Sequence, residues 1–162
     1  MRASKQRRPG TVKAALDRSQ FWTHSKSVDR SGPRSDVVLK RQGIRPSAQR
    51  VAIADYVLWT EEHPTADAVF ARVLETFPMV SRATVYNTLN LFVEKGLLRE
   101  LQVRDDGVVR YDPLMSRHHH FLDEDTGKIY DVPWTDLRVS NVENLKGFSV
   151  TEYQVVLRGR RK

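Results

Sequence analysis

The part of the sequence with the clearest capacity for chemistry is a run of three histidines, His118-His119-His120. Two apolar residues, a polar turn at 124–127 and a second apolar segment at 128–132 follow it, which predicts a β-hairpin with a four-residue loop. Side chains two positions apart on a strand share a face. We therefore expect His118 and His120 to point to one side of the hairpin and His119 to the other.

The register of this hairpin decides whether a carboxylate meets the histidines. If Asp123 pairs with Lys128 across the turn, His120 lies directly opposite Asp131, and opposed side chains are about 5 Å apart. Asp112 approaches the same place through a short linker. Imidazoles and carboxylates without a thiolate favour Fe²⁺ or Mn²⁺ over a structural zinc. The competing interpretation is a solvated histidine run, and a short cluster alone does not decide between the two.

These residues must be positioned by a helical first part and a β-rich second part of the chain. Helices are expected over residues 36–42 and after Ser47, Thr65 and Ser81, each of which is a favourable N-cap. His63 falls in the break before the third helix, where spacing alone does not connect it with the other histidines. The apolar residues that recur at helical spacing and are expected to face the core are Val51, Ala54, Val57, Leu58, Ala68, Val69, Val73, Leu74, Val85, Leu89 and Phe92.

After Gly96 the period of the apolar residues changes from helical to two. This change predicts strands at 97–103 and 108–112, joined by a turn at 105–107. Helices followed by a hairpin are typical of a winged helix-turn-helix, which we assign to residues 36–113 of an α+β protein. The alternative is an unspecialised helical domain that carries a hairpin.

The fourth expected helix is the candidate DNA reader. Val85, Leu89 and Phe92 lie on its apolar side, and the opposite side and its edges carry small side chains or side chains that can bond to base edges. The predicted DNA-binding residues are Arg82, Ala83, Thr84, Tyr86, Asn87 and Asn90. Leu91 also falls on this side, where a contact with a thymine methyl group is the one role we assign to it. Any amphipathic helix has a polar face, so a merely solvated surface stays open as the alternative.

Composition bounds the class of protein. The chain has 162 residues and no cysteine, which excludes disulfides, thiolate metal sites and cysteine nucleophiles. No apolar run approaches the roughly 18 residues of a membrane span, and we expect a cytoplasmic protein without a membrane partner. The net charge of +7 lies within residues 1–35, which hold nine Lys or Arg and two Asp. This segment is predicted to be mostly disordered, with a weak helix over 12–17, and is either a basic arm for DNA phosphates or a solvated tail.

Together these segments resemble the ferric uptake regulator (Fur) superfamily of dimeric, metal-dependent repressors. Within it the chain is most similar to the peroxide-responsive, PerR-like branch, because Asp stands at 112 and 131, where iron-sensing relatives tend to carry Glu. The resemblance covers roughly residues 36–160. The matching stretches are Arg50 to Ala68 with His63-Pro64-Thr65-Ala66-Asp67, Ser81 to Leu89, Arg110-Tyr111-Asp112, and His118-His119-His120 through Gly127 to Asp131.

The resemblance implies a regulatory metal site that holds Fe²⁺ or Mn²⁺. Its ligands would be His63, Asp112, His118, His120 and Asp131. Iron-catalysed oxidation of His63 or His118 by hydrogen peroxide would release a homodimeric repressor from a palindromic operator in double-stranded DNA. Residues 117–162 would form a small α/β dimerisation domain, with 148–157 as its last strand. Neither an enzymatic activity nor a small-molecule substrate is expected.

The chain departs from the superfamily pattern where many relatives bind a structural zinc through two Cys-x-x-Cys pairs. The first pair falls here on Asp123 and Thr126, and the chain ends in residues 158–162 without a second pair. We therefore expect no structural zinc of the four-cysteine kind and a dimer held by packing. The further His that some relatives supply near the last strand is also missing, since Glu152 and Tyr153 occupy that region.

Three other functions compete with peroxide sensing. A haem- or iron-responsive repressor of the same superfamily could use the His118–His120 run, and His119 on the opposite strand face keeps haem open. Two histidines and a carboxylate are also the ligand set of non-haem iron oxygenases, although a five-ligand shell leaves little room for a substrate. A relative that binds DNA without regulation is disfavoured by the complete ligand set.

Overall fold

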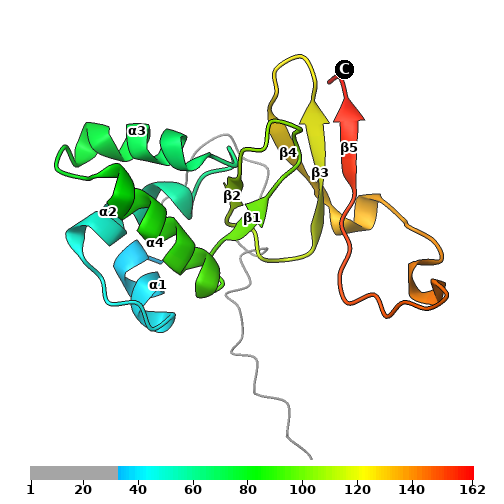
Figure 1. Ribbon diagram of the computed structural model, residues 1–162, viewed down its shortest axis with the longest axis horizontal. Coiled ribbons are helices and arrows are strands. Elements are labelled where there is room, and N and C mark those ends of the chain that lie inside the picture. Colours follow the sequence, from blue (N-terminus) through cyan, green and yellow to red (C-terminus); the bar gives the residue numbers. More distant parts are fainter. Residues whose placement is uncertain (1–32) are drawn as a thin grey trace, which may run out of the picture.

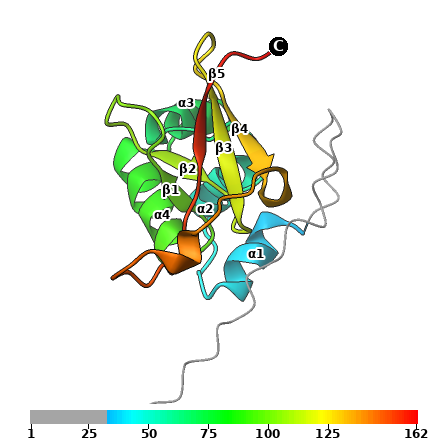
Figure 2. The same ribbon diagram turned by 90° about the vertical axis from the view of Figure 1, so that its right-hand side faces the viewer.

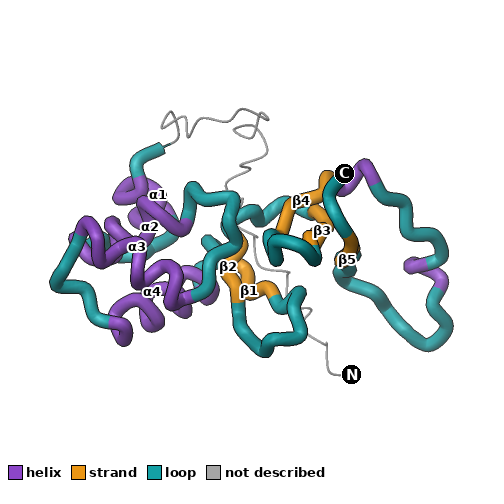
Figure 3. Tube along the Cα trace, turned by 90° about the horizontal axis from the view of Figure 1, so that it is seen from above, coloured by secondary structure: helices purple, strands orange, loops and turns teal. Residues whose placement is uncertain are grey.

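The computed structural model describes residues 33–162, in which four α-helices precede five β-strands (Figure 1). The helices are α1 Ser35–Arg41, α2 Ala48–Val57, α3 Ala66–Thr76 and α4 Arg82–Glu94. The strands are β1 Arg99–Leu101, β2 Arg110–Asp112, β3 His118–Asp123, β4 Ile129–Pro133 and β5 Val156–Gly159. The helices gather on one side, the β3–β5 sheet lies on the other, and the β1–β2 hairpin lies between them (Figures 1 and 3).

Three of the helices begin at the residues that the sequence predicts as caps. The side chains of Ser47, Thr65 and Ser81 each accept a hydrogen bond from the backbone N–H three residues later. These bonds satisfy amide groups that lack a partner within the helix. Because α3 and α4 start at capped positions, the loop before each of them is fixed at the end where the helix begins.

The helices pack around a core of buried aliphatic side chains and Phe92. Most of the predicted inward residues are buried or pack against this core, but two predictions on α3 are wrong. Ala68 is exposed and Leu74 is 38% exposed. The face of α3 that turns inward is centred on Val69 and Val73, with Ala66 one turn before them.

The second part of the chain is built on a three-stranded sheet of order β4-β3-β5 (Figure 2). Strands β3 and β4 are antiparallel, and their register places His120 opposite Asp131, as predicted from the turn. Strand β5 runs parallel to β3 and begins at Val156. The predicted strand over 148–157 is therefore mostly wrong, because only the last two residues of that range belong to β5. Phe148, at the start of the range, is 76% exposed. In the β3–β5 register, residues before 154 have no β3 residue to face, because β3 starts at His118.

The helical content expected for this second part is also absent from the described residues. Between β4 and β5 the chain forms only two 3₁₀ turns, Trp134–Asp136 and Val142–Asn144. Backbone in the left-handed region at Asn141 (φ 63°) and Gly147 (φ 82°) interrupts this segment, and such residues do not continue a right-handed helix. Of the small α/β domain predicted for residues 117–162, the structure therefore contains the strands but no α-helix.

The β1–β2 hairpin contacts the sheet as well as the helices. Leu101 and Val103 are buried against Leu122 and Ile129 in a second apolar cluster, separate from the helical core. The strands themselves are shorter than predicted, with three residues each. The helices and the sheet thus meet through a hairpin that packs on both.

Two further predictions concern the N-terminal tail and membrane insertion. The proposed basic arm, apart from residues 33–35, and the weak helix over 12–17 lie outside the described residues. Within residues 33–162, every helix is too short or too polar to cross a membrane.

Candidate metal centre

The first donor of the site, His63, lies in the loop between α2 and α3. Its backbone adopts φ 49°, in the left-handed region that few residues other than glycine enter. The next residue, Pro64, accepts a hydrogen bond of 3.0 Å from the backbone N–H of Tyr111 in β2, and Thr65 forms an isolated bridge with Arg110. Strand β2 therefore holds this loop, and the His63 side chain is buried.

The second donor, Asp112, ends strand β2. Its Oδ1 atom accepts a hydrogen bond from the backbone N–H of Leu114 at 2.7 Å, and its Oδ2 atom lies 3.1 Å from Nε2 of His118. The carboxylate is buried. Because one oxygen is held by the backbone, the other stays directed at the histidines.

His118 and His120 share one face of β3, as their alternation in the strand predicts. Their Nε2 atoms lie 3.0 Å apart. The Nδ1 atom of His118 lies 2.8 Å from the carbonyl oxygen of Ser116, and since a carbonyl only accepts, Nδ1 must be the donor. In neutral His118 the lone pair is then on Nε2, which faces the other donors.

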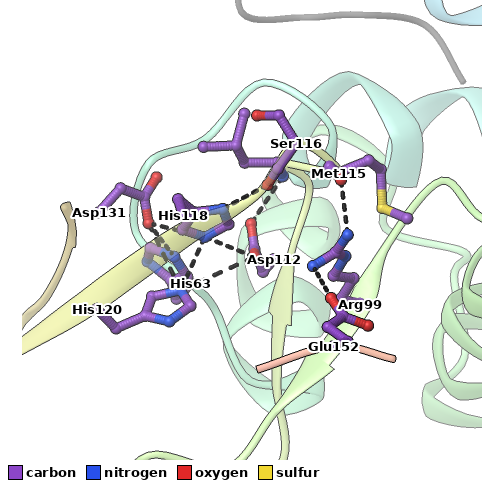
Figure 4. Close-up of polar contacts among 10 residues, drawn as sticks. His63, Arg99, Asp112, Met115, Ser116, His118, His120, Asp131 and Glu152 are labelled. Carbon is purple, nitrogen blue, oxygen red and sulfur yellow. Dashed lines mark hydrogen bonds and ion pairs between the residues drawn. The ribbon is translucent and has the colours of Figure 1, made fainter. Parts of the chain in front are cut away.

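Asp131 completes the group from strand β4. Its Oδ1 atom is 2.9 Å from Nε2 of His63, 3.6 Å from Nε2 of His118 and 3.7 Å from Nε2 of His120. In Figure 4 the five side chains point toward one another from a loop and three strands. One donor atom each from His63, Asp112, His118 and His120 lies within 4.8 Å of all the others.

Several donor atoms in this group have no hydrogen-bond partner among the described residues. They are Nδ1 and Nε2 of His63, Nδ1 of His120 and Oδ1 of Asp131. Buried polar atoms are costly without a partner, and imidazole lone pairs that face one another at 3.0 Å need a proton or a cation between them. The donor set of three imidazoles and two carboxylates fits a divalent transition-metal ion such as Fe²⁺ or Mn²⁺.

For two of the donors, the electrostatics of the site favour the protonation state in which the group can bind a metal ion. Burial, and then the charge of His118, lower the pKa of His120 to about 4. Burial raises the pKa of Asp131, but the neighbouring His63, His118 and His120 outweigh it and hold the value below the ordinary one. At neutral pH His120 is therefore uncharged and Asp131 is ionised, as metal ligands must be.

His118 differs from these two donors. Burial lowers the pKa of its ring, but the adjacent Asp112, the Ser116 carbonyl and the charge of Asp131 together raise it above the ordinary value. Without a metal, the carboxylates of Asp112 and Asp131 therefore favour the protonated form of His118. A metal ion that binds here must displace that proton.

His119 lies on the other face of β3, as predicted. It is fully buried, its Nδ1 accepts a hydrogen bond of 3.1 Å from the backbone N–H of Val155, and its ring stacks on Trp134 at a centroid distance of 4.4 Å. Tyr153 packs against the same tryptophan. These contacts give His119 a structural role, and they disfavour its use as a ligand for haem.

The predicted DNA-reading face of α4 is open to solvent for the most part. Arg82, Ala83, Tyr86, Asn87 and Asn90 are exposed. Thr84 is half-buried, and its hydroxyl pairs with that of the cap Ser81 at 2.9 Å. Leu91 is also half-buried and packs against the helical core, so the expected exposure of Leu91 is wrong.

The structure brings together all five predicted metal-site residues, and it adds contacts for which the sequence gives no signal. The Ser116 carbonyl orients His118. Arg99 in β1 pairs with Glu152 at 3.0 Å and donates to the carbonyl of Met115 at 2.6 Å, so it ties the linker before β3 to the segment before β5. No sequence motif marks either contact.

Comparison with known proteins identifies the family. Residues 41–158 match the ferric uptake regulator family. The chain belongs to this family. Its members are transcriptional regulators, so the chain is a regulator and not an enzyme. Members of this family bind metal ions and DNA and act as dimers.

Three relatives illustrate the similarity. The peroxide operon regulator of Bacillus subtilis (strain 168) is 38% identical over 125 residues, which are 75% of this chain and 84% of the relative. The peroxide-responsive repressor PerR of Staphylococcus epidermidis (strain ATCC 12228 / FDA PCI 1200) is 33% identical over 135 residues, 82% of this chain and 89% of the relative. The solved structure of the Pseudomonas aeruginosa ferric uptake regulator with manganese has a TM-score of 0.62 at 26% identity. The similarity covers 79% of this chain and 98% of the chain in that structure.

Proposed function

We propose that this member of the ferric uptake regulator family is a peroxide-sensing repressor that binds a palindromic operator as a homodimer when its metal site is filled. The observation that carries the proposal is the convergence of His63, Asp112, His118, His120 and Asp131 from separate elements on one buried point. The two relatives above that are named for peroxide response support the choice of signal.

The five converging residues would hold Fe²⁺ or Mn²⁺. Bound Fe²⁺ would supply the redox chemistry that activates hydrogen peroxide, which Mn²⁺ would not. In the proposed sensing step His63 or His118 gains one oxygen atom, with hydrogen peroxide as the source and water as the other product. Either ring loses its ability to act as a ligand, because the added oxygen changes the ring that carries Nε2.

Metal binding would be coupled to DNA binding through the relative placement of the helices and the sheet. His63 belongs to the helical part, Asp112 ends the β1–β2 hairpin, and the other three ligands belong to the sheet. Filling the site favours the arrangement in which all five reach the ion. If that arrangement sets the two reading helices of a dimer roughly 34 Å apart, metal and operator must strengthen each other's binding.

Each part of the chain has a role in this function. Residues 36–113 would be the winged helix-turn-helix, with β1–β2 as the wing, and residues 117–162 the dimerisation domain. The DNA contacts would come from Arg82, Ala83, Thr84, Tyr86, Asn87 and Asn90.

The dimer would form without a zinc ion held by four cysteines. At the two positions where relatives carry their first cysteine pair, Thr126 donates a hydrogen bond of 2.8 Å to Asp123. Asp123 also accepts from the backbone N–H of Asp125 at 3.1 Å. These bonds close the β3–β4 turn without a metal ligand at either position.

The test is DNA binding by the protein loaded with Fe²⁺ or Mn²⁺, before and after micromolar hydrogen peroxide. The probe is a duplex selected from a random library by the Mn²⁺-loaded protein, and peptide mass spectrometry follows each reaction. We expect binding to be lost in the iron form alone, with a gain of one oxygen on the peptide that holds His63 or His118. The control Glu124→Gln, in the exposed turn of the same hairpin, should respond as the unchanged protein does. Metal-dependent binding that survives peroxide in both forms would replace peroxide sensing with iron sensing.

A further inference from the structure

A hollow with a volume of about 330 Å³ lies between the first turn of α2 and the middle of α4, two helices that pack against each other (Figure 1). Its lining residues are all polar and none is acidic: Ser47, Gln49, Arg50, Thr84, Asn87 and Thr88. Thr84 and Asn87 are among the residues of α4 that are proposed to contact DNA. The hollow, called the α2–α4 hollow below, therefore adjoins the proposed DNA surface.

The α2 side of the hollow carries a positive charge without a counter-charge. Nη1 of Arg50 donates a hydrogen bond of 2.9 Å to the carbonyl oxygen of Arg45, which orients the half-buried side chain. Arg50 forms no ion pair with a described residue, and the first turn of α2 contains no acidic residue. The N–H groups of Ala48 and Gln49 have no partner within the helix. The guanidinium and the helix dipole both favour an anion at this place.

The α4 side supplies a hydroxyl group that lacks a partner. Thr88 is 4% exposed, yet it lines the hollow. Its hydroxyl has no hydrogen-bond partner in the part of the chain that the structure describes. A buried hydroxyl without a partner is costly, and a valine would fill a similar volume without that cost. The Thr88 hydroxyl and the Arg50 guanidinium together suit a ligand that has a negative charge and oxygen acceptors.

We propose that the α2–α4 hollow binds a backbone phosphate of the DNA duplex, with Arg50 and Thr88 as donors to its oxygen atoms. This inference rests on the proposed function, in which α4 lies in a groove of the operator. Phosphates line both edges of that groove, so a phosphodiester is the anion that α4 brings to the hollow. Phosphate contacts carry no base information. The hollow therefore fixes the register of α4 on DNA and adds affinity for every sequence.

The first experiment measures dissociation constants of Mn²⁺-loaded variants across a salt titration. One duplex is selected from a random library by the unchanged protein, and the other has a random sequence of the same length. Arg50→Gln should weaken binding to both duplexes by a similar factor of at least about tenfold, because the dimer loses two charged contacts. The log–log salt slope should become shallower by about 1.8, which is about 0.9 for each protomer. Thr88→Val should weaken both complexes at least about threefold with an unchanged slope, because it removes no charge.

Two control variants separate the phosphate contact from effects of charge and packing. Arg138→Gln removes the same charge from the exposed segment between β4 and β5, which lies away from the helices (Figure 1). Thr88→Ser keeps the hydroxyl. Both controls should bind the two duplexes as the unchanged protein does. Near-ultraviolet circular dichroism confirms that each variant is folded, and if Arg50→Gln does not fold, Thr88→Val decides in the same assays.

The second experiment locates the phosphate itself. Symmetry-related pairs of phosphates in the selected duplex are replaced by uncharged methylphosphonates, one pair at a time. At one pair the replacement should weaken binding by the unchanged protein but have little further effect on Arg50→Gln, which corresponds to a coupling of at least about threefold. At other pairs the effects of the replacement and of the variant should be independent.

Several outcomes would overturn the inference while the proposed function stands. These are independent effects at every pair of phosphates, an equal loss of affinity in Arg50→Gln and Arg138→Gln, and unchanged binding by Thr88→Val. Inorganic phosphate that displaces the selected duplex at constant ionic strength from the unchanged protein alone, without coupling at any pair, would assign the hollow to free phosphate. If the unchanged protein enriches no duplex with Mn²⁺ present, the proposed function fails together with this inference, which is a different result.

Discussion

Nε2 of His63 lies 2.9 Å from Oδ1 of Asp131, although one residue belongs to the loop before α3 and the other to the edge strand β4. The two atoms are not aligned for a hydrogen bond, and both are buried without a hydrogen-bond partner among the described residues. The contact joins the helical part of the molecule to the sheet through two side chains of the candidate metal centre. The helices and the sheet are thereby connected at the same point at which a metal signal would enter.

Removing either residue of this contact should weaken metal binding. We expect His63→Ala and Asp131→Ala to lower Mn²⁺ affinity by at least about tenfold, because each deletes a donor and leaves the other charge or lone pair buried. Titration calorimetry on the metal-free proteins measures the affinity. Glu124→Ala, which removes an exposed carboxylate of the β3–β4 turn, is the control and should bind as the unchanged protein does. Full affinity in Asp131→Ala would exclude Asp131 from the ligand set.

The protonation of His118 should depend on Asp112. Asp112 is the main group that raises the pKa of His118 against the effect of burial, so Asp112→Asn should lower that pKa in the metal-free protein. The amide oxygen of Asn can still accept from the Leu114 N–H, which preserves the local backbone. An NMR titration of the His118 ring measures the change. A pKa for His118 that stays the same or rises would contradict the assigned cause.

The same proton predicts how metal binding responds to pH. The folded, metal-free protein holds a proton on His118 below a raised pKa, whereas His120, with a pKa of about 4, stays neutral. Metal binding displaces the His118 proton, so Mn²⁺ affinity should fall as the pH is lowered through the pKa of His118. Calorimetry in buffers of different ionisation enthalpy should detect proton release at pH values below that pKa. Affinity that is constant between about pH 5 and pH 8 would show that no donor titrates.

His119 should be needed for stability and not for the metal. His119→Leu keeps a buried apolar side chain but removes the acceptor of the Val155 N–H, which should lower the free energy of unfolding by about 1–2 kcal/mol. Urea unfolding measures this loss. Mn²⁺ stoichiometry should stay at that of the unchanged protein, and haem should produce no absorption band that depends on His119. Loss of metal with stability unchanged would make His119 a ligand.

Arg99 should matter more than the carboxylate it pairs with. Arg99→Ala removes the hydrogen bond to the Met115 carbonyl and the ion pair with Glu152, and should lower the free energy of unfolding by about 1–2 kcal/mol. Glu152→Gln removes only an exposed ion pair, which is worth about 0–1 kcal/mol. The two variants are compared by urea unfolding of the metal-free protein. Equal losses would mean that the contact with Met115 contributes nothing.

Much of the site follows from local rules that can be read in the chain. The alternation of side chains in a strand separates His118 and His120 from His119, and the turn at 124–127 sets the register that faces His120 with Asp131. Ser47, Thr65 and Ser81 mark helix starts because their oxygens satisfy nearby amides. These features depend on residues within one turn or one hairpin, where covalent geometry and hydrogen bonding leave few choices.

Other features depend on how distant elements pack, and spacing along the chain carries no information about that. His63 joins the site only because strand β2 holds the loop at Pro64, and its backbone is in the left-handed region that no periodicity predicts. Strand β5 is short because β3 offers no partner before His118. The pairing of Arg82 with Asp67 likewise needs α3 and α4 to bring their first turns together. In each case the deciding contact joins elements whose separation is set by tertiary packing and not by the local pattern.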